Sequence, residues 1–544
     1  MNDSAESLFP NSLLDALRAS PDSAAFEHGP RTVSRRELLT LIRRLAGGML
    51  DVGLGPGRGI GIFTAVSPEA FAAHIAAHVL GCRVVGVRAG YTARQLAQVL
   101  GMGIDALLVD PSTATQELLA AVESTPVLSL GPCLIAVDLL AHADDGRYLA
   151  VIARPDDVAA LFFTSGSTGQ PKGCAMTYRA LSVHWSWKQP RGWSPVASEL
   201  AARFERHLLF GTLASLVVME FLALCLLGDG TAVIPEPDER PLFPYAIERY
   251  RITSSIITVP RLNKMLDVLR DEPLDVSSLR ALLVSGSPIA PARLASALAR
   301  LGPVVYQGYG QTEAGSISIL TPDDIARRSA DVLTSVGRPY PGVEISVRGE
   351  TLEQVPSGET GEIFVRSPYQ MTGYWQQPAE TRDVLSEGWL RTRDLGYVDE
   401  DGFVYLVGRT RDVIIVNALV MYAGSIERVL ASHPDVDQAY VTGASDEQTG
   451  EAVHAFVVPS AGRSVDYGAL AALVRAELGE HSVPKTITEV ATVPLAASGK
   501  PDKRALLARH GGRGSFARGV IVGRSLVDAV NRKPVQVDPL DRGQ

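Results

Sequence analysis

The chain has 544 residues, of which 46% are hydrophobic and 20% are charged, so it is long enough for more than one globular domain and has the composition of an ordinary soluble protein. Its formal net charge of −9 argues against nonspecific nucleic-acid binding, which requires a basic face, and against attachment to an anionic membrane surface. The four cysteines (Cys82, Cys133, Cys174 and Cys225) form no CxxC pair, so they indicate neither a zinc site nor a disulfide framework. Because no secretory signal is visible at the start of the chain, we expect it to act in a reducing cytoplasm.

Strand-like and helix-like segments alternate through the first half of the chain. Residues 59–64 are typical of a strand, residues 67–81 of a helix opened by Ser-Pro-Glu, and residues 83–89 of a second strand. Further strands are expected at 161–164, 231–236, 254–260, 281–286 and 304–310. This recurrent βαβ pattern predicts an α/β fold with parallel sheets covered by helices, and ligands bound at the carboxyl ends of the strands.

The pattern changes near Thr334, where short strands separated by glycine-rich turns predict a small antiparallel sheet or barrel. After Asp412 a small α+β module is expected, with a strand pair followed by a helix. The tail from about His510 is rich in Arg, Gly and Asp and has no periodicity, so we expect it to be disordered or loosely attached.

One apolar stretch, residues 208–227, is long enough to span a bilayer. It contains Glu220, and nothing else in the chain is typical of a membrane protein. A buried helix of a large α/β domain is therefore the preferred interpretation, and no membrane partner is expected.

The strongest chemical signal is LFFTSGSTGQPKG at residues 161–173. An apolar strand leads into a loop of glycines and hydroxyl side chains that ends in Pro171, Lys172 and Gly173. Glycines let backbone N–H groups converge on an anion, while the hydroxyls add donors and the lysine adds positive charge. The loop therefore predicts a phosphate cradle, although it is not a Walker loop, because GxxxxGK[ST] is absent.

The loop TSGSTGQPKG resembles the phosphate-loop signature of the adenylate-forming superfamily, which includes acyl-CoA synthetases, peptide-synthetase adenylation domains and luciferases. Four more motifs resemble those of the family in the right order, namely YGQTEAG (309–315), SVGRPYPGVEI (335–345), GWLRTRDLGYVDEDGFVYLVGRTRD (388–412) and SGKPDKRAL (498–506). The resemblance extends from roughly residue 30 to 508. It implies a large N-terminal adenylating domain (1–408), a hinge (409–412), a small mobile C-terminal domain (413–508) and a flexible tail (509–544).

The resemblance implies a role for each residue that matches a family motif. The phosphate loop would consist of Thr164, Ser165, Gly166, Ser167, Thr168, Gly169 and Lys172. The adenine pocket would be formed by Gly286, Ser287, Pro288, Gly308, Tyr309, Gly310, Gln311 and Thr312, with Tyr309 stacked on the base. Glu313 would bind Mg²⁺, and Asp394 would grip both ribose hydroxyls of ATP. Arg393 replaces the glycine that the family usually has before this aspartate, which predicts an altered local turn.

Three further residues lie toward the C-terminus. Arg409 should contact ribose or phosphate, and Arg411 stands at the hinge position, where the family more often has Asp or Lys. Lys500 should bridge the substrate oxyanion and the α-phosphate. With Thr164 and Glu313, Lys500 completes the set expected to act in catalysis, in which a small-molecule oxyanion, most simply a carboxylate, attacks the α-phosphorus and pyrophosphate leaves.

The segment after the hinge departs from the family. Acyl-CoA synthetases typically have a Gly-Gly-x-Asn-Ile-x-Pro-x-Glu run that lines a thiol tunnel, whereas residues 417–425 are Asn-Ala-Leu-Val-Met-Tyr-Ala-Gly-Ser. Glycines let backbone pass close to a ligand, so their loss predicts a narrowed tunnel and weak CoA ligase activity. The alternative, that the loop tolerates these residues and thioester formation persists, is about equally favoured.

The substrate pocket also departs from the family, because many acyl-CoA synthetases have a histidine beside the substrate that this chain lacks in the matching stretch. Candidate pocket residues are His207, Ser215 and Glu220. A lone buried carboxylate is costly unless it is paired. Glu220 therefore either recognises an amino or hydroxyl group of the substrate or forms an internal salt bridge, and both interpretations stay open.

The leading hypothesis is an ATP- and Mg²⁺-dependent ligase that transfers an adenylated acid to the thiol of CoA or of a phosphopantetheinyl carrier protein. A second hypothesis keeps the adenylation but changes the acceptor to an amine, as in amide ligases or in diazotase-like coupling of AMP-activated nitrite to an arylamine. A third, a catalytically silent binding protein, is disfavoured because Lys172, Glu313, Asp394 and Lys500 are all present. Nothing in the sequence identifies the substrate or the oligomeric state.

Overall fold

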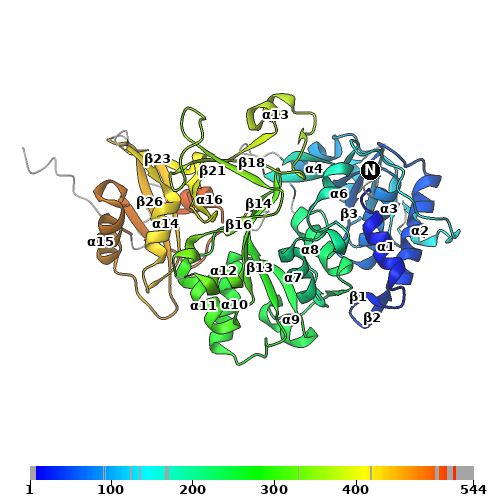
Figure 1. Cartoon of the computed structure of the whole chain (residues 1–544), viewed down its shortest axis with the longest axis horizontal. Helices are drawn as coiled ribbons and strands as arrows, with labels where there is room; N and C mark the ends of the chain where they lie inside the picture. Colours follow the sequence, from blue (N-terminus) through cyan, green and yellow to red (C-terminus); the bar gives the residue numbers. More distant parts are fainter. Residues whose placement is uncertain are drawn as a thin grey trace, which may run out of the picture. The chain divides into compact units, whose positions relative to one another are not determined.

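A computed structural model describes residues 8–89, 91, 93–122, 125–133, 136–165, 171–328, 330–416, 419–446, 448–496, 501–510 and 519–521. The chain divides into two compact units, of which the first comprises Met1–Leu406 with Ala496–Lys500 and the second Val407–Leu495 with Pro501–Gln544 (Figure 1). Each unit is described by itself below.

The first unit contains a nine-stranded sheet, as far as the described residues show, in the order β16-β15-β14-β13-β12-β10-β11-β1-β2. Its strands are β1 (Ala24–His28), β2 (Arg31–Ser34), β10 (Arg206–Leu208), β11 (Thr231–Ile234), β12 (Ser254–Thr258), β13 (Ala281–Ser285), β14 (Val305–Gln311), β15 (Gly315–Leu320) and β16 (Arg338–Pro339). Strands β1 and β10–β14 pair in parallel, while β2, β15 and β16 add antiparallel edges. The predicted strand at 254–260 ends at Thr258 because a helix begins at Val259, with Pro260 in its first turn.

A second sheet of the same unit has eight strands among the described residues, in the order β19-β9-β8-β4-β3-β5-β6-β7. They are β3 (Gly59–Phe63), β4 (Arg83–Gly86), β5 (Ala106–Val109), β6 (Val127–Ser129), β7 (Val137–Asp138), β8 (Val158–Ser165), β9 (Pro171–Thr177) and β19 (Gly373–Tyr374). Strands β3–β8 pair in parallel, and β9 runs back along β8 as an antiparallel hairpin. The predicted α/β fold with parallel sheets is confirmed.

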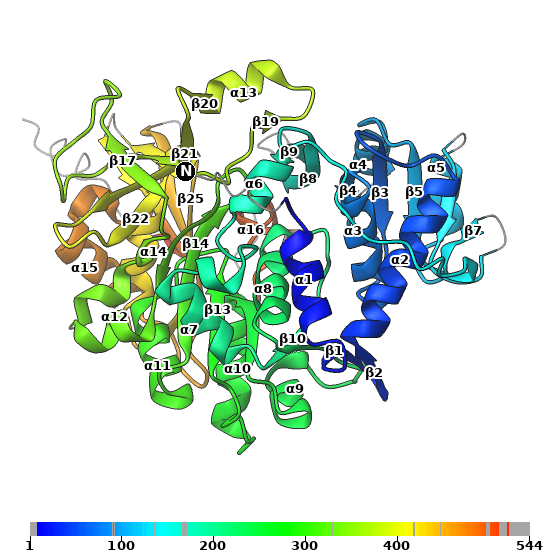
Figure 2. The ribbon, with the colours of Figure 1, turned by 45° about the vertical axis from the view of Figure 1, so that its right-hand side comes forward.

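Helices pack on both sheets of the first unit (Figure 2). They are α1 (Asn11–Ala19), α2 (Arg35–Asp51), α3 (Pro68–Val79), α4 (Ala93–Leu100), α5 (Gln116–Ala121), α6 (Tyr178–Val183), α7 (Pro195–Arg203), α8 (Leu216–Leu227), α9 (Leu242–Tyr250), α10 (Val259–Asp271), α11 (Pro291–Leu301), α12 (Pro322–Arg327) and α13 (Pro378–Val384). Local signals set several starts: Ser34 and Glu37 form a capping box at α2, and the Ser67 side chain caps α3 ahead of Pro68. The expected helix at 67–81 is thus observed at Pro68–Val79.

The apolar stretch 208–227 is divided between two elements. It begins at the end of β10, and α8 occupies only its last part, with Glu220 and most of its apolar side chains buried. Throughout the described part of the chain, every helix is too short or too polar to cross a bilayer. The preferred interpretation, a buried helix of an α/β domain, is confirmed.

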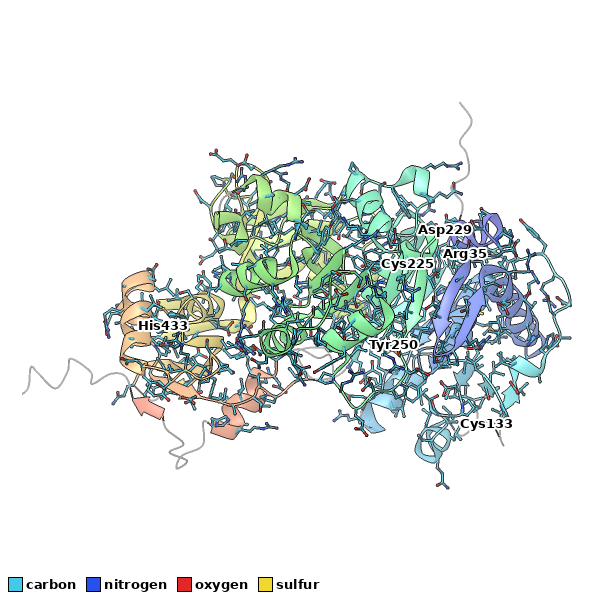
Figure 3. The ribbon with its side chains drawn as sticks, turned by 90° about the horizontal axis from the view of Figure 1, so that it is seen from below. Arg35, Cys133, Cys225, Asp229, Tyr250 and His433 are labelled. Carbon is cyan, nitrogen blue, oxygen red and sulfur yellow. The ribbon has the colours of Figure 1, made fainter. Side chains whose placement is uncertain are left out.

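A buried arginine ties α8 to the N-terminal helices. Arg35, at the start of α2, donates through Nη2 to the carbonyl of Leu226 (2.9 Å) and pairs with Asp229 (3.2 Å) just beyond α8. Figure 3 shows Arg35 beside Asp229 and Cys225. Burial lowers the pKa of Arg35, and the Asp229 carboxylate opposes that effect. The guanidinium therefore satisfies carbonyls at the C-terminus of α8 that the helix itself leaves unpaired.

The rest of the first unit holds a smaller antiparallel sheet. Its described strands are β17 (Glu344–Arg348), β18 (Gly361–Arg366), β20 (Leu385–Ser386) and β21 (Trp389–Val398), and β22 (Val404–Arg409) pairs with β21. The change to short antiparallel strands expected near Thr334 is therefore observed.

The second unit is an α+β module. Its described strands are β23 (Val413–Val416), β24 (Leu419–Tyr422), β25 (Val436–Asp446), β26 (Gly450–Pro459), β27 (Thr486–Glu489) and β28 (Gly519–Ile521), and its helices are α14 (Ala423–Ala431), α15 (Tyr467–Leu478) and α16 (Lys503–His510). Lys503 pairs with Glu427 of α14 (2.6 Å) and lies 3.9 Å from Asp412. Residues 519–521 pair with β27 as an edge strand, and the expectation of a loosely attached tail stays a prediction.

Candidate active site

The β8–β9 hairpin places the two ends of the phosphate loop side by side. In its antiparallel register Thr164 lies opposite Lys172, and Ser165 lies opposite Pro171. Residues 166–170, which include Gly166, Ser167, Thr168 and Gly169, lie outside the described residues, as does the side chain of Ser165. The hairpin therefore fixes where the loop begins and ends, at the carboxyl end of a strand that pairs in parallel with β4.

Lys172, Tyr374 and Glu313 come together from three elements. The Lys172 ammonium pairs with the carboxylate of Glu380 on α13, and it lies 5.1 Å from the centroid of the Tyr374 ring. The Tyr374 hydroxyl donates to Glu313 Oε1 at 3.0 Å. Burial and then the Glu313 carboxylate raise the pKa of Tyr374, so the tyrosine stays a neutral donor at neutral pH.

Glu313 lies in the turn that joins β14 to β15, and its carbonyl accepts from the amide of Met371 at 2.9 Å. Among the described residues no three His, Cys, Asp or Glu side chains gather into a metal-binding group. A single carboxylate suits Mg²⁺, which keeps several waters and is usually held by one or two carboxylates together with phosphate oxygens. The donor set of the turn therefore fits a metal that arrives with a nucleotide.

Asp394 receives two hydrogen bonds from the strand that carries the YGQTE motif. The Tyr309 hydroxyl donates to Asp394 Oδ2 at 2.7 Å, and Gln311 Nε2 donates to the same oxygen at 2.6 Å. Tyr309 and Asp394 are both buried. The proposed adenine side chain and the proposed ribose carboxylate thus share one hydrogen-bonded cluster, although they belong to β14 and β21.

Two backbone positions near this cluster need their particular geometry. A Cβ on Gly310 would lie 2.6 Å from the carbonyl oxygen of Gly315, so only glycine fits there. Arg393 has a φ of 60°, the left-handed conformation that glycine adopts most easily, and its guanidinium pairs with Asp383. The family's glycine position therefore keeps a glycine-like backbone here in spite of the arginine.

The remaining predicted residues occupy several places. Gly286, Ser287 and Pro288 follow β13, Gly308 lies within β14, and Thr312 begins the turn that carries Glu313. Arg409 ends β22, and Arg411 lies in the short 3-10 helix Thr410–Asp412 with its side chain outside the described residues. Lys500 lies outside the described residues altogether.

Glu220 has an internal partner. Its Oε1 is 2.7 Å from His184 Nε2, and its Oε2 accepts from the Ser316 hydroxyl at 2.9 Å. His207 is packed in the core, where its Nδ1 contacts the Ser254 hydroxyl at 3.0 Å and burial lowers its pKa to about 3. Ser215 precedes α8 without capping it through its side chain. Glu220 thus has internal hydrogen-bonding partners, which favours the second of its two interpretations.

Sequence reasoning missed Tyr374, Glu380 and His184. Each lies far along the chain from its partner, as the 36 residues between His184 and Glu220 illustrate, so no local spacing links them. The one available signal was the carboxylate within an apolar helix, which predicts a buried partner without identifying it.

Comparisons with known proteins agree with this geometry. Residues 13–375 match the model of the AMP-binding enzyme family, and residues 425–500 match that of the AMP-binding enzyme C-terminal domain. The chain belongs to the family of AMP-binding enzymes. The adenylate-forming resemblance and the assignment as an AMP-forming ligase, which rested on motifs alone, are therefore confirmed.

Several relatives cover nearly the whole chain. The medium/long-chain-fatty-acid–CoA ligase FadD8 of Mycobacterium tuberculosis is 32% identical over 91% of this chain and 89% of its own length. The feruloyl-CoA synthase of an Amycolatopsis species is 32% identical over 91% of this chain and 97% of its own. Among solved structures, the amide bond synthetase McbA from Marinactinospora thermotolerans is 34% identical with a TM-score of 0.82, covering 91% of this chain and 99% of its own.

Proposed function

We propose that the chain activates a carboxylic acid with ATP as the acyl-adenylate, releases pyrophosphate and then passes the acyl group to a second substrate. The observation that carries this proposal is the convergence of two clusters on the β14–β15 hairpin. Tyr309 on β14 holds Asp394, and Glu313 in the turn contacts Tyr374, whose ring lies beside Lys172. One cluster offers acceptors and an aromatic ring to a nucleoside, and the other offers a cation and a carboxylate to phosphates and their metal.

The chemistry of the first step follows from the charges. A carboxylate oxygen of the acid attacks the α-phosphorus of ATP in line, the bond from that phosphorus to the bridging oxygen of pyrophosphate breaks, and the electron pair leaves with pyrophosphate. Negative charge collects on the phosphoryl oxygens, where positively charged and N–H donors stabilise it most. Lys172 and the backbone amides of residues 165–169 would hold the outer phosphates, and Lys500 would lie between the carboxylate and the α-phosphate.

The other residues of the site bind and orient. Asp394, held by Tyr309 and Gln311, would accept from the ribose hydroxyls, and Gly310 allows the close approach of the β14 and β15 backbones beside them. Glu313 would contribute an oxygen ligand to Mg²⁺, which when bound neutralises charge on the phosphates. The proposed swivel of a small C-terminal domain about residues 409–412 would bring Lys500 into the site for this step.

For the second step we propose a thiol acceptor, either CoA or a phosphopantetheinyl carrier protein. Support comes from the fatty-acid–CoA ligase and feruloyl-CoA synthase that align with about nine-tenths of the chain. Thiol attack on the acyl carbonyl carbon would break its bond to the AMP oxygen, giving the thioester and AMP. The acid itself is proposed only as a class.

An amine is the second candidate acceptor. Two observations favour it: the segment 417–425 lacks the glycines and the Asn of the family's thiol tunnel, and the amide bond synthetase McbA matches this chain at 34% identity over nearly its full length. In the described part of the segment, Leu419–Tyr422 form β24, which pairs with β23. Asn417 and Ala418 lie outside the described residues.

One experiment separates these readings. The enzyme is incubated with ATP, Mg²⁺ and a panel of aliphatic and aromatic acids, with nitrite, or with no substrate, and pyrophosphate release is measured. The acids that respond are then offered CoA, a carrier protein in its phosphopantetheinyl form and a set of amines, and the products are identified by mass. Release with an acid supports the proposal, release with nitrite alone supports diazotase-like coupling, and no release with any substrate contradicts both.

A further inference from the structure

A buried polar network lies directly behind the turn that carries Glu313. Its centre is the hydrogen-bonded pair of His184, which directly follows α6, and Glu220 of α8, with 2.7 Å between His184 Nε2 and Glu220 Oε1. Relative exposure is 0% for His184 and 1% for Glu220. Burying such groups is costly, and replacing a buried pair by apolar residues is often neutral or stabilising, so general stability does not explain this one.

The hydrogen bonds fix the direction of the network. The Ser186 amide donates to His184 Nδ1 at 3.3 Å, which leaves Nε2 as the N–H that donates to Glu220. The second carboxylate oxygen of Glu220 accepts from the Ser316 hydroxyl at 2.9 Å. The network therefore ends on β15, at a residue three positions beyond Glu313.

Tyr369 contacts both Ser316 and His184. Its hydroxyl donates to the Ser316 carbonyl at 2.9 Å, and its ring centroid lies 4.5 Å from that of His184. Gly315 has a φ of 72°, and a Cβ there would lie 3.0 Å from the Tyr369 ring and 3.8 Å from His184 Nε2. The first two residues of β15 are thus held by side chains from three separate elements.

The same contacts reach the turn itself. Gly315 pairs with Gln311 and Ser316 with Gly310 across the β14–β15 hairpin, so fixing β15 fixes the strand opposite. The Met371 amide, two residues from Tyr369, donates to the Glu313 carbonyl at 2.9 Å. A shift of Ser316 would therefore move both ends of the three-residue turn that contains Glu313.

We propose that His184 and Glu220 are positioning residues, which act through Ser316 to hold Glu313 where it binds the metal that accompanies ATP. The proposal rests on the function proposed above, because it takes Glu313 as the metal ligand. The pair would act through Ser316 and the backbone of β15, without itself being a ligand of the metal. The pair would order the backbone of the Glu313 turn before ATP binds. Such preorganisation raises the affinity for the metal–nucleotide complex.

The test measures binding, so it needs no acid substrate. The affinity for α,β-methylene-ATP is measured by calorimetry with Mg²⁺ and again with EDTA. The affinity with Mg²⁺ divided by the affinity with EDTA is called the metal-dependent gain. Ser316→Ala removes the link to the turn but leaves the His184–Glu220 pair intact. We expect it to reduce the gain about tenfold, the size of effect that follows from a ligand misplaced by a fraction of an ångström, with little change in EDTA.

Three further variants make the result specific. Ser318→Ala is the matched control, because Ser318 is a buried serine on the same strand whose hydroxyl donates to the Val336 carbonyl, and it should keep the gain within about twofold. Glu220→Gln can accept from His184 and donate to Ser316, so it should retain most of the gain. Glu220→Leu breaks both bonds and should lose the gain if the variant folds.

The outcomes distinguish the positioning role of His184 and Glu220 from the proposed role of Glu313 as metal ligand. Loss of the gain in both Glu313→Gln and Ser316→Ala, with Ser318→Ala unaffected, supports the proposal. Loss in Glu313→Gln while Ser316→Ala matches Ser318→Ala overturns the positioning role and leaves the proposed metal ligand standing. A full gain in Glu313→Gln overturns both.

Discussion

The hydroxyl of Tyr309 donates a 2.7 Å hydrogen bond to the carboxylate of Asp394, although 85 residues separate the two in the chain. Gln311, on the same strand as Tyr309, donates to the same carboxylate oxygen. The carboxylate is therefore oriented by two donors from the protein itself. A ribose that binds Asp394 would meet an acceptor that has already lost its rotational freedom, which lowers the entropic cost of binding.

Replacing Tyr309 by phenylalanine removes one of these donors and keeps the ring. A hydrogen bond to a charged group contributes about 1.5–3 kcal/mol, so we expect Tyr309→Phe to raise the KM for ATP about tenfold with a smaller change in kcat. Tyr306→Phe is the matched control, because Tyr306 lies on the same strand and donates to Glu199 at 2.6 Å, outside the proposed site. Equal KM values for the two variants would contradict the proposed role of Asp394.

The sequence places Lys500 in the Ser-Gly-Lys motif, and its role stays a prediction. Charge that develops on the α-phosphate in the transition state needs a cation, and loss of one such donor costs about 2–4 kcal/mol. Lys500→Ala should therefore reduce the rate of pyrophosphate release about 100-fold or more while ATP binding, measured by calorimetry, changes little. Lys485→Ala removes a lysine that pairs with Asp446 in the second unit and serves as control. Release by Lys500→Ala within a few-fold of the parent would rule out the assigned role.

Acid should destabilise the first unit through its buried histidines. Burial lowers the pKa of His74 to about 4 and that of His78 and His207 to about 3, so these residues are neutral when folded but bind protons when unfolded below about pH 6.5. When folding lowers the pKa of a histidine, its full contribution to stability is present above the pKa of the unfolded state. That contribution is lost as the pH falls toward the pKa of the folded state. Between pH 7 and pH 5 each of these histidines should lower the free energy of unfolding by about 2 kcal/mol.

The variant His207→Gln isolates one of these contributions. Glutamine can keep a hydrogen bond to Ser254 and does not titrate, so the loss of unfolding free energy between pH 7 and pH 5 should shrink by about 2 kcal/mol. Urea unfolding at the two pH values measures it, with the exposed His481→Gln as control. The same loss in His207→Gln and in the parent would mean that His207 is not the buried neutral group described here.

The altered segment after the hinge predicts slow transfer to CoA. Side chains at Asn417 and Ala418 add bulk where the family has glycine, and overpacking of a tight site costs about 1–3 kcal/mol. The double variant Asn417→Gly/Ala418→Gly should therefore raise CoA thioester formation about fivefold or more, with the rate of adenylate formation unchanged. If the parent already forms the acyl-CoA at ordinary enzyme rates and the double variant gains nothing, the segment does not restrict the thiol.

Much of the fold could be predicted because periodicity and local signals specify it. The strand-helix-strand pattern at 59–89 follows from apolar spacing and from the serine that caps α3, and the antiparallel strands after Thr334 follow from their glycine turns. Tyr309, Glu313, Asp394 and the phosphate loop could be assigned because each lies in a contiguous motif. What the sequence could not provide is pairing between distant segments.

Two contacts illustrate that limit. Glu220 within an apolar helix predicts a buried carboxylate. Its partner His184 could not be predicted, because only the fold brings α8 next to the residue that follows α6. Glu380 is an ordinary charged residue of a short helix, and only the fold brings its carboxylate to Lys172. In the tail, residues 519–521 pair with β27, another pairing of distant segments that composition does not reveal.

The central claim is that this chain joins AMP to a carboxylic acid, and direct detection of the acyl-adenylate tests it. The enzyme, ATP and Mg²⁺ are incubated with the acid panel in the absence of CoA and amines, and the products are analysed by mass together with ATP–pyrophosphate exchange. We predict, for at least one acid, a product with the mass of that acid plus AMP less one water, and acid-dependent exchange that Lys500→Ala abolishes. Exchange that does not depend on any acid, or ATP consumption that yields ADP and phosphate instead of AMP and pyrophosphate, would contradict the account.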